Sequence, residues 1–223
     1  MTQAGGPAAI NGFLYQILHH LGWIADIKLT GTIVDQAIEG DACLVLEPRD
    51  GGDARAETAA AYVVEQYKTR SDGTWSVNVL IGDVLPDLRK SVPEPPVRNA
   101  LYRFVTDGRP GRLETFKTFL AAVRSAQGPD DLDDRETYFF GEDLPSTHGA
   151  LFIHIVKATR RKSERPRADE RASVFHLLSR LEMDFEAKAE LLAEKVERLL
   201  RQYVPNLGDE RGTRERLIGI LVE

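Results

Sequence analysis

Cysteine and long apolar runs are the two features that this sequence of 223 residues most clearly lacks. A single cysteine, Cys43, excludes an internal disulfide, and its place in an apolar run predicts a small core residue. No apolar run approaches the roughly 20 residues of a membrane-spanning helix, and the N-terminus has no basic start followed by an apolar segment. A transmembrane helix and a signal peptide are therefore excluded, and we expect a cytoplasmic protein without a membrane partner.

An excess of positive charge is also missing, because the formal net charge is −6. This balance argues against a protein that coats nucleic acid through bulk charge, but a nuclease needs only a local basic track beside an acidic metal site. Residues 157–167 contain six basic residues and one acid, Glu164. Two interpretations of this run stay open, a grip on phosphates and a solvated loop.

Recognisable nucleotide and zinc motifs are absent too. The chain has no Walker motif, no dinucleotide glycine fingerprint and no nucleophile elbow, so any NTPase of the same system lies outside these residues. His148, His154 and His176 lack the spacing of zinc ligands. His19 and His20 diverge by about 100° on a helix, so we expect one surface and one semi-buried histidine instead of a metal pair.

What is present is the composition of a globular protein, with 42% hydrophobic and 29% charged residues. Periodicity and turn signals predict a helix at 7–26, strands at 41–47 and 61–68 paired as a hairpin, a helix at 76–90 kinked at Pro86, a strand at 101–106 and a helix near 113–123. This order predicts an α/β fold in which a mixed sheet is flanked by helices.

From about residue 130 the pattern is mostly helical, with helices expected at 146–161, 185–204 and from 209 onward. We therefore expect a core domain in residues 1–128 and a mostly helical extension in residues 129–223. The last predicted helix stops among apolar residues without a cap or a glycine stop, which favours an excerpt of a longer protein. A natural terminus that frays is the alternative.

The best candidates for catalysis lie at the end of the second predicted strand. Gln66 and Lys68 point to one face of this strand, and Glu65 and Tyr67 point to the other, because strand side chains alternate. If the first strand pairs directly beside it, Asp41 reaches the same patch as Gln66 and Lys68. Asp41 and the Gln66 side-chain oxygen are hard ligands suited to Mg²⁺ or Mn²⁺, and Lys68 then stabilises developing negative charge. The alternative is an ordinary polar strand end.

Five short blocks in the first half of the chain resemble a known family. They are Gly12-Phe-Leu-Tyr-Gln16, Glu39-Gly-Asp-Ala-Cys-Leu-Val-Leu-Glu-Pro48, Val64-Glu-Gln-Tyr-Lys-Thr-Arg70, Thr74-Trp-Ser76 and Tyr102-Arg-Phe-Val-Thr-Asp-Gly-Arg109. In this order they resemble the Mrr-like branch of the PD-(D/E)XK nuclease superfamily. More narrowly, they are similar to nuclease domains at the N-termini of large bacterial antiphage defence proteins, including STAND-type NTPases.

The family signature carries an aspartate on one strand and Asp/Glu/Gln-x-Lys on the next, and Asp41, Gln66 and Lys68 fill these places. The resemblance implies a restriction-endonuclease-like fold and Mg²⁺-dependent hydrolysis of double-stranded DNA by a defence effector. It also implies control by homo-oligomerisation or by an attached sensor or NTPase region. Nothing resembles a base-reading motif, so we expect low sequence specificity.

Several residues are held in reserve around this predicted site. Where many relatives carry an acid on the first helix, this chain has Gln16. Glu39, Glu47 and Glu65 are reserve metal ligands, because a shift of register changes which acid reaches the site. Trp75 and Tyr67 flank the site and have two interpretations, DNA contact or core packing.

A rival hypothesis is a catalytically inactive nuclease fold that serves as an interaction or assembly module. The two hypotheses differ in geometry, since an active site brings Asp41, Gln66 and Lys68 within a few ångströms and the rival predicts that they are scattered.

Overall fold

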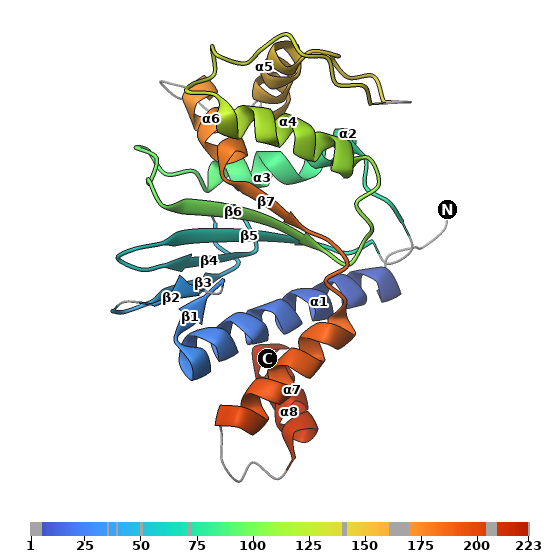
Figure 1. Cartoon of the computed structure of the whole chain (residues 1–223). Coiled ribbons are helices and arrows are strands. Elements are labelled where there is room, and N and C mark those ends of the chain that lie inside the picture. Colours follow the sequence, from blue (N-terminus) through green and yellow to red (C-terminus); the bar gives the residue numbers. More distant parts are fainter. Residues whose placement is uncertain are drawn as a thin grey trace.

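A mixed five-stranded sheet lies between two groups of helices (Figure 1). The computed structural model describes residues 6–34, 36–38, 40–49, 51–70, 73–139, 142–160, 170–203 and 209–222. The strands are β3 (Cys43–Leu46), β4 (Ala54–Glu57), β5 (Tyr62–Lys68), β6 (Ala100–Thr106) and β7 (Leu181–Asp184), and they are hydrogen-bonded in this order. β3, β4 and β5 are antiparallel, whereas β5, β6 and β7 are parallel. This arrangement confirms the predicted α/β fold.

The helices follow the periodicity of the sequence, with short π-helical turns at Asp26–Thr30 and Leu80–Val84. They are α1 (Gly6–Ala25), α2 (Val77–Val79), α3 (Leu85–Lys90), α4 (Leu113–Ser125), α5 (His148–Thr159), α6 (Glu170–Ser179), α7 (Ala189–Tyr203) and α8 (Glu210–Val222). Two further strands, β1 (Thr32–Ile33) and β2 (Gln36–Ala37), form a separate small ribbon. Among the described residues, no helix is both long and apolar enough to cross a membrane.

Each face of the sheet packs against its own set of helices. α3, α4, α5 and α6 lie on one side, and α1, α7 and α8 lie on the other (Figure 1). Along β5, Val64 belongs to the core under the first set, whereas Val63 and Tyr67 belong to the core around α1. A strand covered on both faces reads as an almost continuous buried run, and this is the pattern of β5.

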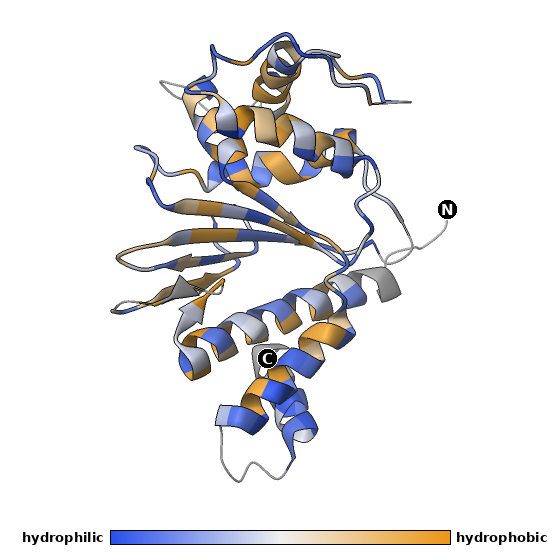
Figure 2. Ribbon diagram, in the orientation of Figure 1, coloured by the Kyte–Doolittle hydropathy of each residue, from blue (hydrophilic) through white to orange (hydrophobic). Residues whose placement is uncertain are grey.

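The main core lies between the sheet and the helices α3 to α6. It joins Tyr102 and Phe104 of β6 to Phe119 of α4, Phe152 of α5 and Leu177 of α6. Hydrophobic residues concentrate in the sheet and in the helices on this side of it, whereas α7 alternates between hydrophobic and hydrophilic (Figure 2). The apolar stripe of α4, predicted from its spacing, is buried here.

Two predictions about organisation are wrong. β3 and β5 do not form a hairpin, because β4 pairs with both and lies between them. The core domain does not end at residue 128, because β7 pairs with β6 and α5 and α6 pack in the same core as the first half of the chain. Cys43 is exposed instead of buried, since β3 is the edge strand of the sheet.

Candidate active site

Gln66 and Lys68 occupy the carboxyl end of β5, on the face predicted from strand alternation. Gln66 is buried, and Lys68 is partly exposed and lines a groove with Trp75 and Val84. Tyr67 points to the opposite face, where its ring stacks on that of His19 at 4.4 Å between centroids. The predicted common orientation of Gln66 and Lys68 is therefore confirmed.

Asp41 does not join them. Cys43 is level with Glu57 of β4, and Glu57 is level with Tyr62 at the start of β5. Asp41 precedes Cys43 and is exposed, so it lies at the end of the sheet opposite to Lys68. At about 3.3 Å per residue, β5 alone separates the two ends by roughly 20 Å. The predicted convergence of Asp41 with Gln66 and Lys68 is wrong. The prediction paired β3 directly with β5, whereas β4 lies between them and sets a different register.

A different aspartate, Asp53, lies where Asp41 was expected. It directly precedes β4, and its backbone N–H donates to the carbonyl of Glu65 at 2.7 Å. Its Oδ2 atom accepts hydrogen bonds from the Tyr67 backbone N–H and from Gln66 Nε2, each at 2.6 Å. A carboxylate only accepts hydrogen bonds, so the amide nitrogen of Gln66 faces Asp53 and the Gln66 Oε1 atom is left for another partner.

The turn before Asp53 requires two glycines. Gly51 and Gly52 have φ angles of +104° and +76°, which side-chain-bearing residues rarely adopt. A Cβ atom on Gly51 would lie 2.2 Å from the backbone oxygen of Asp87, and one on Gly52 would lie 2.5 Å from Val64 Cγ1. The turn closes against α3 and β5 only because both positions lack side chains, and this closure places Asp53 beside Gln66.

Glu47, a predicted reserve ligand, lies at the other end of the same loop. Its backbone N–H donates to the carbonyl oxygen of Asp53 at 2.9 Å. Burial, followed by the negative charge of Asp53, raises the pKa of the Glu47 carboxyl, and Lys68 opposes this. Burial also raises the pKa of Asp53. Hydrogen bonds from the Tyr67 backbone amide and from Gln16, and the positive charge of Lys68, lower this pKa but do not cancel the rise. Two carboxyl groups and one ammonium group therefore lie within each other's electrostatic field.

Helix α1 contacts Asp53 of the cluster formed by Glu47, Asp53, Gln66 and Lys68. Gln16 hydrogen-bonds to the Asp53 carboxylate, and His20 Nε2 lies 3.1 Å from the Asp53 carbonyl oxygen. These positions are one turn apart and so share a face of the helix. The expectation of one surface histidine is wrong, because both His19 and His20 are buried. α1 packs against the sheet on one side and through Ile17 against α7 on another, which covers both rings.

The other predicted residues have different positions. Glu65 faces α1 and is held by Arg103 and by the Tyr67 hydroxyl at 2.6 Å, so it is not near the cluster's open side. Trp75 is buried, donates from Nε1 to Thr106 Oγ1 at 3.0 Å and carries Arg70 above its ring. Core packing is thus the role of Trp75 and Tyr67. Glu39 and residues 161–169 of the basic run lie outside the described residues.

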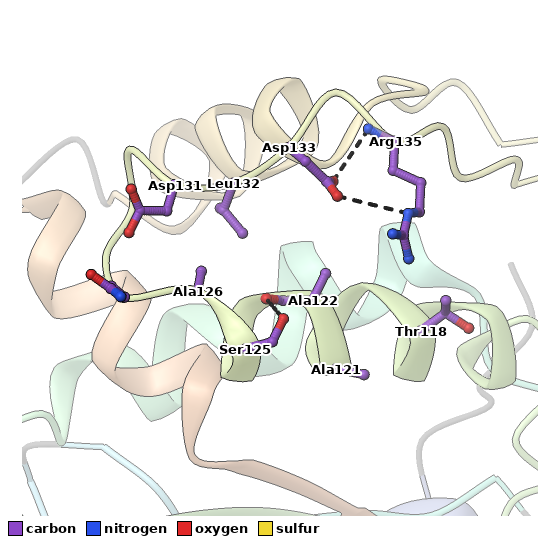
Figure 3. Close-up of a pocket in the computed structure, with 10 residues that line it drawn as sticks. Thr118, Ala121, Ala122, Ser125, Ala126, Asp131, Leu132, Asp133 and Arg135 are labelled. Carbon is purple, nitrogen blue, oxygen red and sulfur yellow. Dashed lines mark hydrogen bonds and ion pairs between the residues drawn. The ribbon is translucent and has the colours of Figure 1, made fainter.

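An open groove of about 630 Å³ runs along the exposed side of Lys68 and is lined by Thr69, Arg70, Asp83 and Pro86 among others. A second groove lies between α4 and residues 126–135 (Figure 3). Two of its charged groups, Asp133 and Arg135, are paired with each other, and Asp133 also contacts His148. The groove beside Lys68 is therefore the better candidate for a substrate.

Comparison with protein-family models, curated proteins and solved structures finds no match to this chain. The chemistry of the site therefore has to be inferred from its side chains. Within the described part of the chain, no three His, Cys, Asp or Glu residues converge as a metal site. What the cluster offers a cation is two carboxylates, from Glu47 and Asp53, and the amide oxygen of Gln66.

Proposed function

We propose that this chain is a metal-dependent nuclease domain that hydrolyses phosphodiester bonds in DNA, with Asp53, Gln66 and Lys68 at its centre. The observation that carries the proposal is the hydrogen bond from Gln66 to Asp53, which directly precedes the strand paired with β5, with Lys68 two residues further along β5 on the same face. The PD-(D/E)XK signature requires an aspartate on the strand next to the one that bears Gln-x-Lys. Asp53, immediately before β4, comes beside Gln66 as this signature requires, and Asp41 does not, because β4 lies between β3 and β5.

The donor set fits Mg²⁺ or Mn²⁺. Both cations favour hard oxygen ligands, and Asp53, Glu47 and the Gln66 Oε1 atom supply them. The raised pKa values of Glu47 and Asp53 also fit, because loss of solvent around each carboxyl group opposes its ionisation more than Lys68 favours it, and a bound cation would relieve that cost. When bound, such a cation neutralises phosphate charge and lowers the pKa of a coordinated water.

Lys68 supplies the positive charge of the protein itself. Its ammonium group acts on the carboxyl groups of both Glu47 and Asp53, and it borders the groove on the open side of the sheet. In that position it stabilises negative charge that develops on a phosphate bound in the groove. Gln16 restricts the Asp53 carboxylate from the opposite side and takes the place of a first-helix acid.

The wider biological role rests on the resemblance of the sequence blocks. We propose an effector of bacterial antiphage defence that acts on double-stranded DNA, in a restriction-endonuclease-like fold. Its activity would be controlled by homo-oligomerisation or by a sensor or NTPase region.

A second candidate function is an inactive assembly module, and two observations favour it. Asp41 is scattered from Gln66 and Lys68, as this hypothesis predicts. Phe13 and Leu14 of α1 and Leu191 of α7 are 48%, 39% and 57% exposed, beside an open groove that Leu14 and Leu18 line. Exposed apolar side chains grouped in this way are typical of an interaction surface.

Plasmid degradation with Mg²⁺ or Mn²⁺ separates the two. We expect cutting by the wild-type protein, alone or after forced dimerisation, and its loss in Lys68→Ala and Asp53→Asn. Asp41→Asn is the matched control, because it removes an exposed carboxylate at the far end of the sheet. Loss of cutting in Asp41→Asn with retention in Asp53→Asn would overturn the site. Absence of cutting in every form, with dimers confirmed, would favour the assembly module.

A further inference from the structure

One backbone carbonyl links the two acidic residues of the candidate site to helix α1. The Asp53 oxygen accepts the backbone N–H of Glu47 at 2.9 Å and lies 3.1 Å from His20 Nε2. The first of these bonds joins Glu47, directly after β3, to Asp53, directly before β4. The second fixes this link to helix α1. The Asp53 carbonyl oxygen therefore connects the backbone of both Glu47 and Asp53 to α1.

His20 donates a hydrogen bond to the Asp53 carbonyl oxygen. It is 5% exposed, and its ring meets that of Tyr67 edge-on at 5.7 Å between centroids. The carbonyl can only accept, so the Nε2 atom carries the proton.

We infer that His20 is a positioning residue that holds the Glu47–Asp53 loop in the geometry needed to bind a divalent cation. This inference rests on the proposed function. His20 itself contacts no reacting group. Its effect passes through the carbonyl of Asp53 to the two carboxylates, as outer hydrogen-bond partners commonly orient the ligands of a metal.

The neighbouring histidine supplies a matched control. His19 is 7% exposed and stacks on the same Tyr67 ring, so it is similar to His20 in burial and also contacts Tyr67. Its Nε2 atom has no hydrogen-bond partner among the described residues. A role limited to packing predicts the same result at both positions, whereas positioning of the loop predicts an effect at His20 alone.

The test compares His20→Met, His20→Gln and His19→Met. Methionine and glutamine have similar length and flexibility, but only glutamine restores a donor. The readouts are Mn²⁺ affinity of the protein without DNA, by isothermal titration calorimetry, the melting temperature and plasmid cutting. We expect His20→Met to weaken Mn²⁺ binding by about 10-fold to 100-fold. His20→Gln should recover a large part of that loss, and His19→Met should bind Mn²⁺ as the wild type does.

Equal Mn²⁺ affinity in His20→Met and the wild type would overturn the inference while leaving the nuclease proposal intact. So would an equal loss in His19→Met, because packing alone would then explain it. If His20→Met does not fold, His20→Phe keeps the ring without the donor and answers the same question. A wild-type protein that neither binds Mn²⁺ nor cuts DNA would overturn the proposed function and this inference together, which is a distinct result.

Discussion

The buried ion pair between Glu65 and Arg103 gives the sharpest prediction about stability. Glu65 is 1% exposed, and its hydrogen-bond partners are the Arg103 guanidinium and the Tyr67 hydroxyl. Arg103 lies on the neighbouring strand β6 and also contacts Asp184 of β7 at 3.2 Å. One arginine therefore ties together the three parallel strands of the sheet, and Arg103→Met removes that tie while keeping an apolar side chain of similar length.

The magnitude follows from the charge that the substitution leaves behind. Removing one partner of a buried pair costs about 3–5 kcal/mol, because the other charge remains buried without compensation. Asp184 is about half exposed and contributes little, since water screens it. We therefore expect Arg103→Met to lower the free energy of unfolding by about 3–5 kcal/mol at neutral pH. Replacing both partners, as in Arg103→Met with Glu65→Leu, should recover most of this loss.

The loss should also depend on pH, with a defined sign. Burial already raises the pKa of Glu65 in the folded wild-type protein, with Arg103 opposing the shift. Without Arg103 the folded pKa rises further above the unfolded value, so the folded state takes up a proton first. The variant therefore gains stability as the pH falls from this raised folded pKa to the unfolded pKa, and loses it as the pH rises through the same window, at about 1.4 kcal/mol per pH unit.

Urea denaturation at pH 7.5 and pH 5.5, followed by circular dichroism, measures both effects. The difference between wild type and Arg103→Met should be smaller at pH 5.5 than at pH 7.5. A loss below about 1 kcal/mol at pH 7.5 would refute the assignment of Glu65 as an ionised group held by Arg103. A difference that is the same at both pH values would refute the link to its protonation.

Two further predictions concern the loop that carries Asp53. Gly51→Ala should lower the free energy of unfolding by roughly 2–5 kcal/mol, because it combines a positive φ with a Cβ atom 2.2 Å from the Asp87 oxygen. The exposed Gly82, with open space around its Cβ position, is the control, and an equal loss in Gly82→Ala would contradict this reasoning. Acidification should weaken Mn²⁺ binding, and this weakening should begin at a higher pH than it would at a site made of ordinary carboxylates. The reason is that the pKa values of Glu47 and Asp53 are raised and only the ionised carboxylates bind the cation. Calorimetric titration across pH 4.5–7.5 measures this, and an affinity that stays constant over that range would contradict it.

The sequence predicts the long elements well and the short ones poorly. α1, α4, α7, β5 and β6 carry either a helical apolar stripe or a continuous apolar run, so local periodicity is enough to find them. β4 has the sequence Ala-Arg-Ala-Glu, and none of these residues favours a strand. Its hydrogen bonds to β3 and β5 stabilise it, and a local sequence pattern does not predict such pairing between strands.

The error at Asp41 came from this same strand. The predicted strands left residues 48–60 as a hairpin loop, although most hairpin loops have about 2–5 residues. That excess length was a usable sign of a missing element. The second usable sign was the glycine pair before Asp53, because adjacent glycines mark a close approach of the backbone. What local pattern cannot supply is the register, which determines whether Asp41 or Asp53 stands beside Gln66.

Strand β5 carries stability on one face and the proposed chemistry on the other. Glu65 and Tyr67 point into the buried network around Arg103, while Gln66 and Lys68 point to Asp53 and the open groove. The two sets of substitutions should therefore separate. Lys68→Ala should abolish cutting with little change in the free energy of unfolding, because Lys68 is partly exposed and lines an open groove. Arg103→Met should weaken folding while the protein that remains folded still binds Mn²⁺. A protein in which Lys68→Ala is as destabilising as Arg103→Met would place Lys68 in the core and remove the basis for its proposed catalytic role.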